Sequence, residues 1–404
     1  MTTPGSDRDD RLVSGRFLLI VAAGLAYFLA LGVVLPVVPQ YVEDELGGGS
    51  LAIGIAVGAL FVGAVLLRPY VGRLGDRTGR RLLIVFGAAI VAVSVFLYGA
   101  VESLPFLVGA RVLTGLGEAA FFVGAATMIT DLAPESRRGE AISYWSVAVY
   151  GGLAFGPVIG EAALERGYGA VWITAGLLAT LATALSCFTR EVERPTSDED
   201  LGKEPIVNRA AIGPGAVLFS GLIALAAFSA FVPLYADDVG LDSPDVVFLL
   251  YGCFVLVVRI FGARIPDSLG GRVAGASALL CTAAGMAIMA AWSTTPGLLL
   301  GTVFLAAGAS LLYPALLLLA LGAAPETQRG SVVGTFSSFF DLSQGLGSLI
   351  VGSVAALTSF QGAFAAGSVF AFIGFGGLWF HSTRVRRRAR MDEAGALAAE
   401  HPGP

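Results

Sequence analysis

The segment Ala133-Pro-Glu-Ser-Arg-Arg-Gly139 returns 191 residues later as Ala324-Pro-Glu-Thr-Gln-Arg-Gly330, and each copy lies between two long apolar runs. A repeat at so long an interval indicates two related halves, each a bundle of hydrophobic helices. Duplicated membrane bundles are typical of secondary transporters, which hold their substrate where the halves meet. The repeat therefore indicates a carrier before any chemistry is considered.

Two further pairs of segments match in the same order along the chain. Residues 39–44 (PQYVED) resemble residues 233–238 (PLYADD). The pattern R-x4-R-x2-D-x2-G-x-R of residues 68–81 returns at residues 259–272, again 191 positions later. Three separate matches in one order establish the duplication.

The composition is that of a membrane protein. Of the 404 residues, 56% are hydrophobic and only 14% are charged, whereas a soluble domain has about 25% charged residues. Twelve apolar runs are each long enough to cross a hydrocarbon layer of about 30 Å. They lie near residues 17–39, 50–70, 82–101, 104–130, 140–163, 168–188, 213–235, 245–263, 273–292, 296–322, 331–357 and 362–381. We therefore expect an all-α membrane protein with twelve transmembrane helices in two pseudo-symmetric six-helix bundles.

The basic residues predict the orientation of these spans. Of the 25 Lys and Arg residues, all but Arg111 and Arg166 fall on one side, and basic residues favour cytoplasmic loops. Both termini are therefore expected in the cytoplasm, with the protein in the plasma (inner) membrane. The expected parts are a cytoplasmic N-terminal segment (1–16), an N-terminal bundle (17–188), a cytoplasmic linker (189–212), a C-terminal bundle (213–381) and a cytoplasmic tail (382–404).

The loop after the second span carries the clearest motif. Its sequence Gly72-Arg-Leu-Gly-Asp-Arg-Thr-Gly-Arg-Arg81 resembles the signature loop of the major facilitator superfamily. The resemblance covers about residues 17–381 and implies that family's fold. It also implies that Asp76 docks against the start of span 11 and closes the cytoplasmic side, where it would meet the positive end of the helix dipole. The expected gating residues in this loop and its second copy are Gly72, Asp76, Arg77, Gly79, Arg80 and Asp267.

Span 5 contains Gly152-x3-Gly156-Pro157-x2-Gly160. This pattern resembles the glycine–proline motif of the superfamily's drug–proton exporters, although Glu161 replaces its last glycine. Gly156 and Pro157 are therefore further candidates for gating. Small residues at every fourth position are also a general device for close helix packing, so a purely structural role is the alternative.

Three charged residues inside spans are candidates for proton coupling. Arg111 and Glu118 lie seven residues apart on one face of span 4, and Asp341 lies on a polar stripe of span 11. A charge within the membrane is costly unless it faces a cavity or a partner. The family resemblance implies that an arginine in span 4 takes part in proton movement. The alternative is a permanent polar contact between helices. We expect Arg111 to be the only basic residue within a span.

Aromatic residues of several spans are candidates for the substrate cavity. An aromatic and partly acidic cavity favours amphipathic or cationic molecules. The expected cavity residues are Tyr27, Phe121, Phe122, Tyr150, Phe228, Tyr313 and Gln344. Lipid-facing or core positions are the alternative for most of them.

The chain carries no pattern for a metal, a cofactor or an enzyme. The three cysteines lack metal-ligand spacing, and no nucleophile–His–acid set or phosphate-binding loop is present. We predict proton-coupled efflux of small amphipathic compounds by alternating access. A symporter importing a sugar, an organic acid or another metabolite is the alternative. The expected partners are a small-molecule substrate, protons and membrane lipid, without nucleic acid, and the expected functional unit is a monomer.

Overall fold

A computed structural model gives the arrangement of the chain. It describes residues 14–133, 138–191, 207–241, 243–262, 268–324 and 329–379. Within these ranges the regular secondary structure is entirely helical. The predicted tail (382–404), most of the N-terminal segment and most of the linker lie outside the described residues.

In the first half, the described residues form seven helices. In chain order they are α1 (Gly15–Val34), α2 (Val37–Asp44), α3 (Ser50–Thr78), α4 (Arg80–Tyr98), α5 (Leu104–Leu132), α6 (Arg138–Leu164) and α7 (Tyr168–Cys187). Together α1 and α2 form the first span, Gly15–Asp44. Pro36 lies at the break between them and, lacking an N–H, cannot continue the hydrogen-bond ladder of α1.

The second half repeats this arrangement. Its helices are α8 (Arg209–Asp238), α9 (Asp245–Phe261), α11 (Gly271–Ala291), α12 (Thr295–Gly322), α13 (Arg329–Leu357) and a final helix, Phe360–Trp379. The starts of α6 and α13 are 191 residues apart, which is the offset of the sequence repeat. The two halves are therefore related helix by helix.

The twelve predicted spans all fall on helices. Eleven of the described helices are long and apolar enough to cross a membrane. The twelfth, α9, has 17 residues, at the short end of the range for a crossing helix. The predicted all-α fold of twelve membrane-crossing helices in two bundles is confirmed for the described part of the chain.

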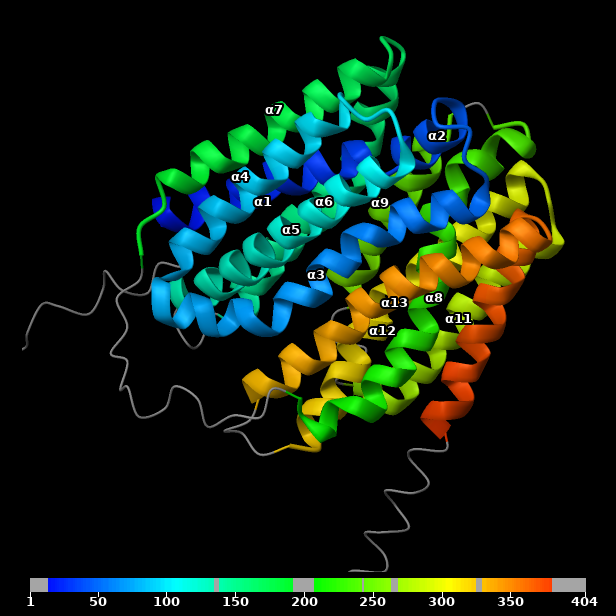
Figure 1. The fold of residues 1–404 in the computed structure, drawn as a ribbon. Coiled ribbons are helices and arrows are strands. Elements are labelled where there is room, and N and C mark those ends of the chain that lie inside the picture. Colours follow the sequence, from blue (N-terminus) through cyan, green and yellow to red (C-terminus); the bar gives the residue numbers. More distant parts are fainter. Residues whose placement is uncertain are drawn as a thin grey trace, which may run out of the picture.

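The halves form two groups of helices, blue to green and green to red in Figure 1. The main contacts between them are those of two helix pairs: α3 packs against α13, and α6 packs against α9. Because α3 matches α9 and α13 matches α6 in the repeat, the two junctions are equivalent. Residues that lie between the halves should therefore be sought on these four helices.

Glycines allow the helices of each junction to approach closely. A Cβ on Gly54 would lie 2.4 Å from the backbone oxygen of Ser348, and one on Gly58 would lie 2.6 Å from that of Gly345. At the other junction, a Cβ on Gly252 would lie 2.2 Å from the Cβ of Ala154. These contacts lie toward the predicted outer side, where α3 begins and α13 ends. The halves are thus tightly packed along that side.

The glycines of span 5 pack α6 against α1 within the first half. A Cβ on Gly156 would lie 2.5 Å from the Cα of Gly32, and one on Gly160 would lie 2.4 Å from the oxygen of Val33. Pro157 touches the same surface, since it lies 3.3 Å from a Cβ built on Gly32. The motif thus allows two backbones to meet inside one bundle. A role of Gly156 and Pro157 in gating stays a prediction.

The close contact at Gly156 predicts different effects on stability for two alanine substitutions on α6. Gly156→Ala should lower the melting temperature in detergent, because overpacking a tight contact costs about 1–3 kcal/mol. A Cβ on Gly151 would meet only one described atom within 4 Å outside the backbone of its own helix, Cδ1 of Leu25 at 3.8 Å. Gly151→Ala should therefore leave the melting temperature unchanged or raise it, since alanine favours a helix over glycine by about 1 kcal/mol. Equal shifts in both variants would contradict the packing described.

Candidate functional site

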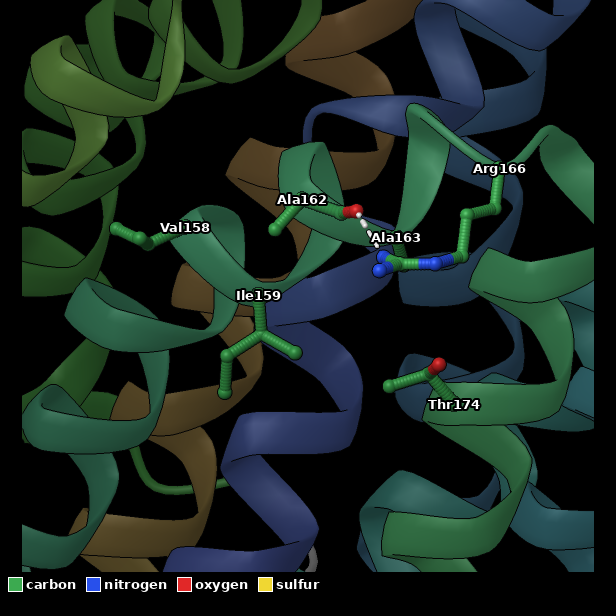
Figure 2. Close-up of a pocket in the computed structure, with 6 residues that line it drawn as sticks. All are labelled: Val158, Ile159, Ala162, Ala163, Arg166 and Thr174. Carbon is green, nitrogen blue, oxygen red and sulfur yellow. Dashed lines mark hydrogen bonds between the residues drawn. The ribbon is translucent and has the colours of Figure 1, made fainter.

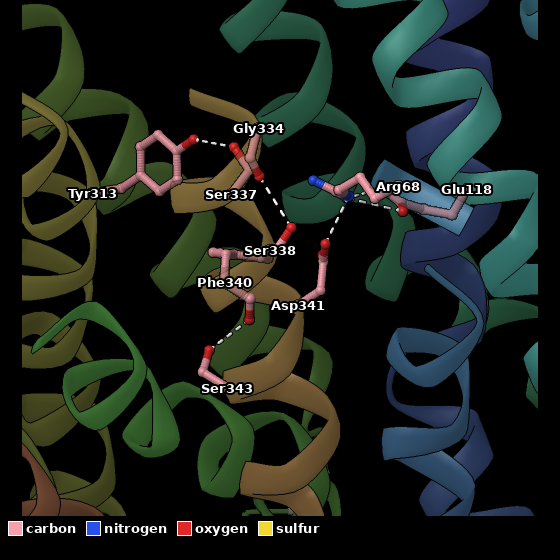
Figure 3. A network of polar contacts seen from close by, with 9 residues as sticks. All are labelled: Arg68, Glu118, Tyr313, Gly334, Ser337, Ser338, Phe340, Asp341 and Ser343. Atoms are coloured by element: carbon pink, nitrogen blue, oxygen red, sulfur yellow. Dashed lines mark hydrogen bonds and ion pairs between the residues drawn. The ribbon is translucent and has the colours of Figure 1, made fainter. Parts of the chain in front are cut away.

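Arg68 of α3 lies at the centre of a buried ion-pair cluster. Its Nη2 is 3.1 Å from Oε2 of Glu118 on α5, and its Nε is 2.6 Å from Oδ2 of Asp341 on α13. Figure 3 shows the guanidinium between the two carboxylates. Its Cζ also lies over the ring of Phe122, 5.3 Å from the centroid. One cation therefore pairs with one acid of its own half and with one acid of the other half.

The cluster is almost completely removed from solvent. The side chains of Arg68, Glu118 and Asp341 are 9%, 13% and 1% exposed. Removing one partner of a buried pair typically costs 3–5 kcal/mol, because the other charge stays buried without compensation. The pair between Arg68 and Asp341 thus joins the two halves through a buried contact of opposite charges.

Arg68 was not among the predicted site residues. The sequence places it at the start of a basic segment, which the positive-inside rule assigns to a cytoplasmic loop. In the structure α3 continues to Thr78, so Arg68 lies about 15 Å before the end of its helix. The prediction that Arg111 is the only basic residue in a span is therefore wrong. The repeat could have indicated Arg68 as a candidate, since Arg68 and Arg259 occupy the same position in the two copies.

Arg111 has a different environment from Glu118, although both lie on α5. Its Nε donates to the carbonyl of Ala56 at 3.1 Å, and its Nη2 donates to that of Val57 at 3.4 Å. Arg111 thus joins α5 to backbone carbonyls of α3 well away from Arg68. Its role in proton coupling stays a prediction, and the described contacts are those of a clamp between two helices.

A second arginine occupies the equivalent junction between α9 and α6. Nη2 of Arg259 donates to the hydroxyl of Tyr150 at 2.6 Å, and its Cζ lies 4.2 Å from the centroid of the Tyr150 ring. The repeat relates the two sites, because Arg68 matches Arg259 and Asp341 matches Tyr150 at an offset of 191. One difference between the sites is that a tyrosine stands in the second where the carboxylate of Asp341 stands in the first.

The remaining cavity candidates are mostly buried in this conformation. Tyr27 and Phe121 stack with centroids 3.9 Å apart, and neither has exposed surface; Phe228 is 1% exposed. Gln344 donates to the carbonyl of Leu222 on α8 at 3.2 Å. Contact of these four residues with substrate stays a prediction.

Tyr313 lies at the edge of the cluster and bonds within the second half. Its hydroxyl forms a hydrogen bond of 2.8 Å with Ser337, one turn of α13 before Asp341. It matches Phe122 in the repeat, so the two arginine sites have aromatic residues at corresponding places. Figure 3 shows Tyr313 on the far side of α13 from Arg68.

The loop between α3 and α4 is partly described. Gly79 has a φ of 90°, which side-chain-bearing residues rarely adopt. The carboxylate of Glu191 accepts the backbone N–H groups of Arg80 at 3.0 Å and Arg81 at 2.9 Å. It thereby satisfies free donors at the start of α4. The Arg80 side chain pairs with Asp131 at the end of α5.

The other predicted gating residues cannot be placed in this way. The surroundings of Gly72, Asp76 and Arg77 lie outside the described residues, although their backbone belongs to α3. Asp267 lies outside them altogether. The docking of Asp76 against α13 stays a prediction.

A surface hollow of about 360 Å³ lies between the end of α6 and the start of α7, about two turns of α6 beyond Tyr150. Figure 2 shows Arg166 at its rim, donating to the carbonyl of Ala162 at 3.2 Å. Its other lining residues are small or aliphatic, apart from Thr174. The hollow lacks convergent polar groups, so nothing about it indicates a binding site. No group of three or more potential metal ligands occurs within the described ranges.

The sequence pattern of the Major Facilitator Superfamily matches residues 20–295 and 271–399, almost the whole chain. The chain belongs to this superfamily. Among the similar relatives of this superfamily member, an uncharacterized MFS-type transporter of Salmonella typhimurium is 30% identical over 88% of this chain and 93% of its own length. The uncharacterized MFS-type transporter YhhS of Escherichia coli K12 is 27% identical over 84% and 85%.

Solved structures of the superfamily share the fold of this MFS chain. The human organic anion transporter MFSD10 superposes with a TM-score of 0.70 at 21% identity, covering 93% of this chain and all of that one. A bacterial homolog of the human lysosomal transporter Spinster gives 0.75 at 17% identity, covering 94% and 98%. The protein is thus an MFS-type transmembrane transporter of small molecules.

Proposed function

We propose that this transporter couples proton movement to the efflux of small amphipathic compounds by alternating access. One observation carries the proposal: Arg68 is shared by Glu118 of its own half and Asp341 of the other half. Intramembrane ionisable residues of this kind are the usual elements of proton relays in transporters.

Because Arg68 is shared between the two acids, protonation of Asp341 would change the contact between the halves. When Asp341 is protonated it loses its charge, and the ion pair across the α3–α13 junction is lost. Arg68 then still has Glu118 at 3.1 Å, so its charge does not become stranded as the halves separate. The halves can therefore separate at this cluster without leaving an uncompensated cation. This keeps the energy barrier to the conformational change low.

The resemblance of the span 5 motif to that of drug–proton exporters supports export. The aromatic side chains at the two arginine sites, Phe122 beside Arg68 and Tyr150 beside Arg259, suit an amphipathic substrate. Asp76 and Asp267, with the glycines and arginines of their loops, would close the cytoplasmic side, and Arg111 would hold α5 against α3.

Charge counting favours a second candidate, symport of an organic acid with a proton. Arg68 and Arg259 carry two positive charges at the junctions, and Glu118 with Asp341 carries two negative charges. Protonation of Asp341 leaves one positive charge in excess, which a bound anion would balance. A proton and an anion would then cross together.

Accumulation assays distinguish the two candidates. Cells that lack their own efflux pumps would be loaded with amphipathic dyes and drugs, with and without this protein and a protonophore. Lower accumulation that the protonophore restores is the expected result. Unchanged dye levels, combined with protonophore-sensitive uptake of an organic acid, would favour the symporter. Transport that is insensitive to the protonophore in both assays would contradict proton coupling.

A further inference from the structure

The charge of Arg259 has no carboxylate partner among the described side chains. Its contacts there are the Tyr150 hydroxyl at 2.6 Å and the Tyr150 ring at 4.2 Å. Its Nε is buried and makes no hydrogen bond with any described group. Arg68, at the equivalent position, contacts two carboxylates. The second site therefore has the cation of the first without its anions.

Arg259 is partly buried and its Nε is buried without a hydrogen bond to a described group, so the guanidinium needs more compensation than this site supplies. Arg259 lies in the last turn of α9, where the helix dipole offers about half a negative charge. A tyrosine hydroxyl and ring contribute only partial charges as well. An arginine presents a planar fork of donors that matches a carboxylate or a similar oxyanion. The unpaired Nε is one donor of that fork.

The repeat shows which groups are absent. The position that matches Asp341 is Tyr150, and the position that matches Glu118 is Ala309. Replacing an acid by alanine removes both its charge and its volume. The second site therefore keeps the cation of the first site but has neither of its two carboxylates.

We propose that Arg259 and Tyr150 bind the anionic group of an amphipathic monoanion, of the carboxylate class, as the transported substrate. The site lies between the halves, since Arg259 belongs to α9 and Tyr150 to α6. A bound carboxylate would accept from the Arg259 fork and from the tyrosine hydroxyl. This inference rests on the proposed function only in taking the junction between the halves as the transport pathway.

Ligand-induced thermal stabilisation of the purified full-length protein tests the anion site. The probes are naphthoate, benzoate and decanoate, each compared with its neutral amide. A ligand that binds only the folded state raises the melting temperature. At least one carboxylate should stabilise the wild type more than its amide does. That preference should weaken about 10- to 100-fold in Arg259→Gln, as expected for a charge-assisted contact.

Three further variants separate recognition from misfolding. Arg259→Lys keeps the charge and should retain part of the preference, and Tyr150→Phe should weaken binding by about 10-fold. Arg166→Gln, at the surface hollow, should bind as the wild type does. The inference is overturned if no carboxylate is preferred over its amide, or if the preference persists unchanged in Arg259→Gln. Binding that needs Arg259, without proton-driven transport, would instead refute only the proton coupling.

Discussion

Replacing Arg68 with glutamine is expected to destabilise the folded protein by about 3–5 kcal/mol and to abolish proton-driven transport. The substitution leaves Glu118 and Asp341 buried near each other without their shared cation. Two carboxylates in such a place repel each other and lack water to screen them. Thermal unfolding in detergent and uptake into proteoliposomes with an imposed pH gradient measure the two effects.

Two further variants test whether stranded charges cause the loss of stability in Arg68→Gln. Asp341→Asn combined with Arg68→Gln removes one stranded charge, so the double variant should be more stable than Arg68→Gln alone. Arg68→Lys keeps a charge but loses the planar fork that reaches both acids, and its stability should be intermediate. A double variant less stable than either single variant would show that the residues do not interact as described.

Asp341→Asn is expected to uncouple transport from the proton gradient while leaving exchange of substrate across the membrane intact. Asparagine is neutral, so the ion pair to Arg68 across the halves cannot form at any pH. A loss of about 3 kcal/mol at the contact between the halves corresponds to about a 100-fold change in the ratio of conformations. Accumulation driven by a pH gradient, compared with exchange in its absence, measures the effect.

Glu118→Gln is the matched control for this substitution. It removes the carboxylate within the first half but keeps the pair between Arg68 and Asp341 at 2.6 Å. Its effect on the contact between the halves should therefore be smaller than that of Asp341→Asn. Equal uncoupling in both variants would mean that the link across the halves is not the coupled element.

The sequence was sufficient to predict the architecture, because duplication and hydrophobic length are properties of local segments. The offset of 191 residues between two short motifs correctly predicted two equivalent bundles. The twelve apolar runs predicted helices whose bounds differ by a few residues from those observed. At Ser50–Thr78, however, the helix continues past the apolar run into the charged segment.

The same extension explains why part of the site could not be predicted. The predicted run 50–70 puts Arg68 at its edge, beside the basic segment, and only the extension of α3 to Thr78 places it well inside a helix. Its partners, Glu118 and Asp341, lie 50 and 273 residues away in the chain. Glu118 and Asp341 were predicted as functional acids because acids are rare in spans. Their common partner depends on how α3, α5 and α13 pack, which hydropathy does not specify.

The most direct test of the account measures the separation of the halves as a function of pH. Spin labels at Leu74, near the end of α3, and Val333, near the start of α13, both exposed, would report the distance between these parts of the two helices. Cys187, Cys253 and Cys281 are free and would be replaced first. In the wild-type sequence, the distance distribution should change between alkaline and acidic buffer as Asp341 gains its proton. In Asp341→Asn it should be the same in both buffers. A pH response of equal size in Asp341→Asn would contradict a proton-controlled ion pair between the halves.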